Sequence, residues 1–87
     1  MLIERRVGDV LVTQMGVERT RLTGTARLAD DLGLDSLALT EALLVLEDEM
    51  TISIPDPVQV CLVTFADLVA VVAAEVHAAG SPRQELG

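Results

Sequence analysis

The sequence predicts an all-α fold: a small four-helix bundle of three longer helices and one short helix, with a long first loop. Its 87 residues fit one small domain, because a chain of this size buries only about 60% of its unfolded surface and cannot support a deep active-site cleft. Hydrophobic residues make up 51% of the chain and aromatic residues 1%, Phe65 alone, so we expect an aliphatic core. Three stretches repeat apolar residues at helical spacing. We assign residues 1–80 to the helical domain and expect residues 81–87 to form a flexible tail.

The first predicted helix covers residues 3–15, and a long loop follows it. The apolar residues of this helix are Ile3, Val7, Val10, Leu11 and Met15, and Gly16 is placed to end it. Residues 17–31 are rich in Thr, Gly and Arg and have no clear period, which predicts a loop. Unsupported loops longer than about 12–15 residues are uncommon in compact domains. We therefore expect the loop to be pinned onto the core by Leu22, Leu28 and Leu32.

The second predicted helix begins near Ser36 and ends near Met50, with Asp35 or Ser36 as its N-cap. One stripe at helical spacing is apolar and should face inward: Leu39, Ala42, Leu43, Leu46 and Met50. A second stripe mixes apolar and acidic residues and should face outward: Leu37, Glu41, Leu44 and Asp48, with Glu47 beside it.

The last third of the chain predicts a short helix and a long one. Asp56 followed by Pro57 is typical of an N-cap and a first helical position, which begins a short helix over residues 57–61. Thr64 with Asp67 three residues later indicates a capping box at the start of the long helix. Residues 80–82, Gly-Ser-Pro, should end this helix. The inward stripe of the long helix consists of Phe65, Leu68, Val69, Val72 and Val76. The methionines Met15 and Met50 should also belong to the core.

The charge and the reactive residues argue against several classes of function. A net charge of -8 with a pI near 4.3 repels nucleic acids and anionic membranes. All six basic residues are arginines and none lies between residues 28 and 82, an interval with ten acids, so we expect basic protein partners. The chain has one cysteine, Cys61, which cannot form an internal disulfide, and one histidine, His77, which with a single cysteine cannot build a metal site. This favours a reducing, cytoplasmic setting. We find no signal peptide or membrane span and expect a monomer.

Ser36 is the residue with the most informative chemistry, and the local pattern has two explanations. Asp-Ser before an apolar run is a common helix cap. A hydrolytic nucleophile would instead need a Gly-x-Ser-x-Gly turn or a base within hydrogen-bonding reach. The only histidine, His77, is placed to interact with a helix C-terminus. We therefore expect no catalytic residues and no enzymatic activity.

Several blocks of sequence occur together in register. They are residues 3–7, residues 14–17, the run Asp-Leu-Gly-Leu-Asp-Ser-Leu at 31–37, the run Leu-Glu-Asp-Glu-Met at 46–50, and Ile-Pro-Asp at 54–56. Together they resemble the acyl carrier protein family over residues 2–79. The resemblance implies that Ser36 carries 4'-phosphopantetheine, transferred from coenzyme A by a phosphopantetheinyl transferase, and that the thiol of this arm holds acyl groups as thioesters. It also implies that acyl-loading, condensing and modifying enzymes with basic patches recognise Asp35, Leu37, Glu41, Leu44, Glu47 and Asp48.

Departures from the family pattern leave the pathway and some alternatives open. Ala38 stands where fatty-acid-type carriers often have an acid and is closer to some polyketide-type carriers, so both pathways remain. We favour core packing over an acyl pocket or an apolar partner surface for the hydrophobic residues Val58, Val60, Cys61 and Val63. One alternative function is a stand-alone peptidyl or aminoacyl carrier, which would more often have Gly-Gly before its serine motif. Another is a non-carrying helical interaction module that uses its acidic face.

Overall fold

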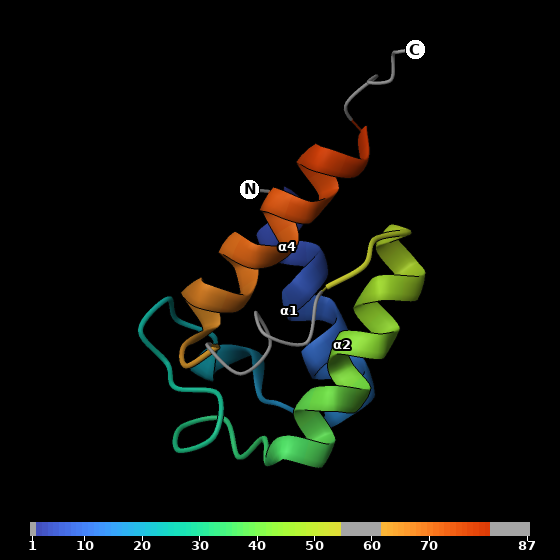
Figure 1. The fold of residues 1–87 in the computed structure, drawn as a ribbon. Coiled ribbons are helices and arrows are strands. Elements are labelled where there is room, and N and C mark those ends of the chain that lie inside the picture. The colour runs from blue at the N-terminus through green and yellow to red at the C-terminus, as the bar shows by residue number, and fades with distance from the viewer. Residues whose placement is uncertain (1, 55–61, 81–87) are drawn as a thin grey trace, which may run out of the picture.

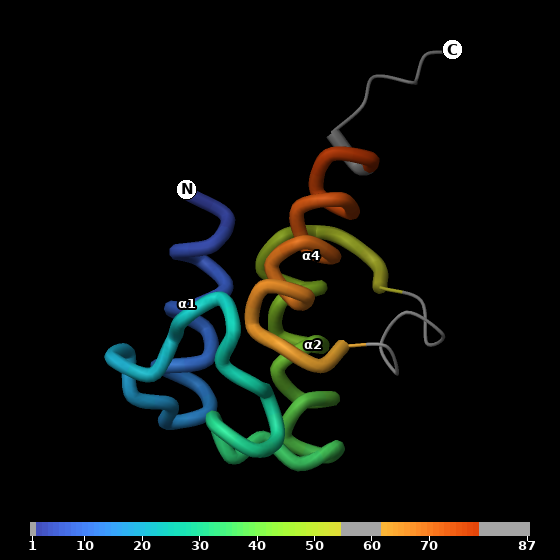
Figure 2. The backbone as a smooth tube through the Cα atoms, turned by 90° about the vertical axis from the view of Figure 1, so that its left-hand side faces the viewer, coloured from blue at the N-terminus to red at the C-terminus, as the bar shows by residue number. Residues whose placement is uncertain are grey.

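Three α-helices, with a short 3-10 helix after the first, make up the regular structure of the described residues. The computed structural model describes residues 2–54 and 62–80, which form α1 (Leu2–Met15), η1 (Arg19–Arg21), α2 (Ser36–Met50) and α4 (Phe65–Gly80). The helix α1 packs against both α2 and α4, and the long loop passes the end of the molecule where α2 begins (Figure 1 and Figure 2). The described residues contain no strand, so the all-α prediction is confirmed.

Some sequence-based predictions fall outside the described residues. The short helix predicted at residues 57–61 is one of them, and so are Val58, Val60 and Cys61. The tail predicted at residues 81–87 is another. These remain predictions.

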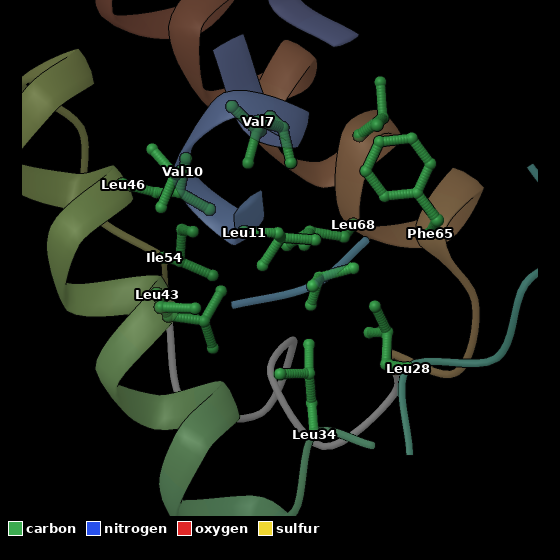
Figure 3. Packing of buried hydrophobic residues seen from close by; sticks show 14 residues of the cluster. Val7, Val10, Leu11, Leu28, Leu34, Leu43, Leu46, Ile54, Phe65 and Leu68 are labelled. Atoms are coloured by element: carbon green, nitrogen blue, oxygen red, sulfur yellow. The ribbon is translucent and has the colours of Figure 1, made fainter. Parts of the chain in front are cut away.

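Aliphatic side chains and Phe65 form one core cluster between the three helices (Figure 3). The predicted inward stripes are confirmed, since at most 9% of the surface is exposed for Val7, Val10, Leu11, Ala42, Leu43, Leu46, Phe65, Leu68, Val69 and Val72. The other predicted members pack against the edge of the cluster: Ile3, Met15, Leu39, Met50 and Val76. No polar or charged side chain among the described residues is buried, so the removal of apolar surface from water is what holds the helices together.

The loop between α1 and α2 is held down by its leucines, as predicted. Gly16 ends α1 in the left-handed conformation, with φ of 74°, which glycine adopts without the steric cost of a Cβ atom. Leu28 is 2% exposed, and Leu22 and Leu32 pack against the core cluster. The helix η1 was not predicted, because its Arg-Thr-Arg sequence has no apolar period.

A backbone connection between the loop and the start of α4 was also not predicted. Residues 24–28 hydrogen-bond to residues 63–66 through main-chain atoms at N···O distances of 2.8–3.0 Å. Arg27 and Thr64 form an isolated antiparallel bridge there. Val63 is 56% exposed, so the core packing that we predicted for this residue is wrong. The pairing fixes the loop at a second place, beyond the contacts of its leucines.

The helix α4 begins with the predicted capping box. The Asp67 N–H donates to the Thr64 hydroxyl at 3.1 Å, and the Asp67 carboxylate accepts from the N–H groups of Thr64 and Val63 at 3.1 and 3.2 Å. These backbone donors, that of Thr64 first, hold the pKa of Asp67 below its ordinary value, because they stabilise the charged carboxylate. The helix ends at Gly80, as the sequence predicts.

Candidate functional site

Ser36 is the first residue of α2, and its side chain is exposed. The N-cap is Asp35, whose carboxylate accepts a hydrogen bond from the Ala38 N–H at 2.8 Å. The carbonyl of Ser36 accepts from the Thr40 hydroxyl at 2.8 Å, but the hydroxyl of Ser36 has no hydrogen-bond partner among the described residues. Helix capping therefore explains Asp35 and does not explain Ser36, whose hydroxyl is free to react.

The segment before Ser36 is fixed by backbone geometry and by one buried leucine. Gly33 has a φ of 73°, which turns the chain toward α2. The next residue, Leu34, is 4% exposed, and its N–H donates to the carbonyl of Leu28 at 2.9 Å. Figure 3 shows Leu28 and Leu34 entering the core cluster from the side of the loop. The buried Leu34 thus lies two residues before Ser36 and sets where its hydroxyl emerges.

Asp31 closes the same loop through Arg27. Its carboxylate accepts from the Arg27 backbone N–H at 2.8 Å and from the Arg27 Nε at 3.4 Å. The pKa of the exposed Asp31 carboxyl is lowered. The largest cause is the hydrogen bond from the Arg27 backbone N–H, and the Arg27 guanidinium lowers it further. A second nitrogen of Arg27, Nη1, lies 3.4 Å from the Asp30 carboxylate.

A pocket of about 490 Å³ opens beside Ser36. Its apolar wall combines residues from the loop, from α2 and from the segment before α4: Leu28, Leu34, Leu39, Leu43, Leu62 and Val63. The polar residues of its described lining are Arg27, Asp30, Asp35, Ser36 and Thr40. A concave, mostly apolar surface with a few polar groups is typical of a small-molecule site. The sequence had indicated Ser36 but not this pocket, because the loop contributes to it only after folding back on α2.

The outward stripe of α2 lies on the surface, as predicted. Leu37 is 68% exposed and Leu44 is 60% exposed, and Glu41 and Asp48 are exposed beside them. Single exposed leucines are common on protein surfaces, whereas two that alternate with carboxylates on one helix form a small amphipathic patch. We call these four residues the α2 outer face.

Glu47 lies apart from the α2 outer face. It is half-buried, and its Oε2 atom accepts a hydrogen bond from the Ile54 N–H at 2.6 Å. The carboxylate thereby ties the end of α2 to the segment that follows. Sequence spacing placed Glu47 next to the outward stripe and had no means to show this backbone contact.

The structure gives Ser36 no histidine partner. His77 is in the last turn of α4, and Figure 1 shows that this turn and the first turn of α2 lie at opposite ends of the molecule. In the part of the chain that the structure describes, no group of three or more His, Cys, Asp or Glu side chains is arranged to hold a metal ion. None of the described helices is both long and apolar enough to cross a bilayer.

Comparison with known proteins gives the class of this protein. The chain matches the family model for a phosphopantetheine attachment site over residues 5–72, so it is a carrier domain for a covalently attached 4'-phosphopantetheine. It is similar to an acyl carrier protein of Akkermansia muciniphila, with 38% identity over 68 residues that cover 78% of this chain and 85% of that protein. The chain belongs to the acyl carrier protein family, as the sequence blocks indicated, and it is a carrier rather than an enzyme.

Proposed function

We propose that the hydroxyl of Ser36 is the attachment point for 4'-phosphopantetheine and that the protein carries acyl intermediates in fatty-acid or polyketide biosynthesis. The observation that carries the proposal is that the Ser36 hydroxyl is exposed and has no hydrogen-bond partner among the described residues, while Asp35 caps the helix. In the transfer, the Ser36 oxygen forms a new bond to phosphorus and the pyrophosphate bond of coenzyme A breaks. Adenosine 3',5'-bisphosphate leaves, and the hydroxyl proton passes to the transferase.

The surroundings of Ser36 fit this group. When attached, the arm supplies a terminal thiol that holds an acyl group as a thioester. The polar lining of the pocket, including Thr40, can accommodate the amides of an arm, and the leucines Leu39, Leu43 and Leu62 can keep water from an aliphatic chain. A volume of about 490 Å³ is within the range of pockets that bind small molecules, roughly 300–1,000 Å³.

We further propose that the α2 outer face and its neighbours recognise the enzymes that load, extend and modify the cargo, and the transferase itself. The residues involved are Asp35, Leu37, Glu41, Leu44, Glu47 and Asp48. Their charge suits partners with Arg and Lys patches, because electrostatic attraction speeds encounter without making a complex too tight to release. Glu47 would act through the carboxylate oxygen that does not bind Ile54.

The proposal includes a cytoplasmic, monomeric carrier whose domain is residues 1–80. The single cysteine supports a reducing compartment, since no internal disulfide is possible.

The experiment is intact-mass analysis after incubation with coenzyme A, Mg²⁺ and a promiscuous phosphopantetheinyl transferase. We expect the parent protein to gain the mass of one phosphopantetheine and Ser36→Ala to gain nothing. Ser53→Ala is the matched control, because Ser53 is also exposed, and it should gain the same mass as the parent. A gain that survives Ser36→Ala would contradict the proposal. Identification of the thioester on protein purified from its native cell would then distinguish fatty-acid from polyketide cargo.

A further inference from the structure

Among the residues that the structure describes, Arg27 is the one cationic side chain that lines the pocket beside Ser36. The other charged residues of the described lining are both acidic, Asp30 and Asp35. The sequence has no Arg or Lys from residue 28 to residue 82, so the first half of the chain supplies the positive charge of this region. An anion placed at Ser36 would therefore face like charges, with Arg27 as the available counter-charge.

The backbone holds Arg27 in this place from two sides. The bridge between Arg27 and Thr64 joins it to the start of α4, and the bond from Leu34 to Leu28 brings the residue after Arg27 alongside the segment that leads to Ser36. The Asp31 carboxylate, which binds both the backbone N–H and the Nε of Arg27, orients the side chain.

The guanidinium of Arg27 keeps donors available. Its contacts with Asp30 and Asp31 are both 3.4 Å long, and its side chain is 57% exposed, so water weakens both pairs. Its Nη2 atom donates no hydrogen bond within the described residues. Arginine suits a phosphate because its planar group can donate two parallel hydrogen bonds.

We infer that Arg27 is the positioning residue for the arm: it pairs with the phosphodiester formed at Ser36 and offsets the repulsion from Asp30 and Asp35. This inference rests on the proposed function, since it needs the phosphodiester at Ser36. The pair steadies the start of the arm at the mouth of the pocket without touching the thioester.

The test compares apo and phosphopantetheine-loaded forms of the full chain. Loading is first verified by intact mass for the parent, Arg27→Gln, Arg27→Lys and Arg21→Gln. Arg21 is the matched control, because it lies in the same loop, pairs with Glu18 at 3.4 Å and does not line the pocket. The readouts are the melting temperature of each apo and loaded form and the ³¹P chemical shift of each loaded form.

We expect the loaded-minus-apo difference in melting temperature to fall by about 2–4 °C in Arg27→Gln, as for one exposed ion pair in a domain of this size. The ³¹P resonance should shift in the same variant, Arg27→Lys should retain part of both effects, and Arg21→Gln should match the parent. High salt should reduce the contrast, because it screens the pair. Since the difference compares two forms of one variant, any cost of losing the Asp30 and Asp31 contacts cancels.

A loaded Arg27→Gln variant with the parent's temperature difference and ³¹P shift would overturn this inference and leave the proposed function standing. An equal change in Arg21→Gln would also overturn it, because the effect would then reflect net charge alone. A parent protein that gains no mass would overturn the proposed function itself.

Discussion

Replacement of Leu28 by alanine should remove much of the stability of this domain, although Leu28 lies in a loop. Its side chain is 2% exposed and contributes to the core cluster between the helices. Truncation of a buried leucine typically costs about 2–5 kcal/mol, from lost burial and from the cavity that remains. A chain of 87 residues has a total stability of roughly 4–13 kcal/mol at the usual 0.05–0.15 kcal/mol per residue. We therefore expect Leu28→Ala to lower the free energy of unfolding by about 3 kcal/mol.

Urea unfolding followed by circular dichroism measures this loss, with Leu44→Ala as the matched control. The control deletes the same atoms from a side chain that is 60% exposed, so its effect should stay within about 0.5 kcal/mol. The slope of the free energy against urea should be similar in both variants, so that the midpoints report stability. Equal losses in the two variants would refute the conclusion that the loop is part of the core.

Two further predictions concern the helix ends. Thr51, the C-cap of α2, has a left-handed φ of 56°, which is strained for a residue with a Cβ atom. Thr51→Gly should therefore raise the free energy of unfolding in urea by about 0.5–1 kcal/mol, because relief of this strain exceeds the entropy that glycine adds to the unfolded chain. A lower free energy of unfolding would contradict the strain. The pKa of Asp67 is lower in the folded state than in the unfolded state, where it is near 3.8. The stability that the Asp67 carboxylate contributes is therefore complete above pH 3.8 and is lost as the pH falls through the lower pKa of the folded state. Asp67→Asn should therefore weaken the fall of melting temperature with pH below 3.8. A pH profile identical to that of the parent would exclude the capping contribution.

The parts of the fold that follow from local pattern could be predicted from the sequence. The helix bounds near Gly16, Ser36 and Thr64 were right because caps and apolar spacing act within a few residues. The inward and outward sides of α2 were right for the same reason, since helical geometry alone decides which residues share a face.

The parts that depend on contacts between distant segments could not be predicted. The pairing of residues 24–28 with residues 63–66 joins two segments that have no strand-like alternation, so no local sequence pattern predicts this pairing. Val63 was assigned to the core because it is apolar, but this pairing fixes its backbone while its side chain remains exposed. The Glu47 contact with Ile54 and the pocket beside Ser36 likewise exist only after the chain has folded back.

Under the proposed function, the division of roles at the start of α2 explains why a large group can be added there without disturbing the fold. Asp35 provides the cap, and Leu34 provides the buried anchor. The Ser36 hydroxyl has no hydrogen-bond partner among the described residues, so modification breaks no hydrogen bond within that part of the chain. What modification does change is charge, beside a pocket whose described lining includes two acids, Asp30 and Asp35. A difference in stability between the apo and loaded forms therefore reports mainly on electrostatics and on contacts of the arm itself. That is why the loaded-minus-apo comparison isolates the role of Arg27, which a comparison of loaded variants alone would confuse with the stability of the loop.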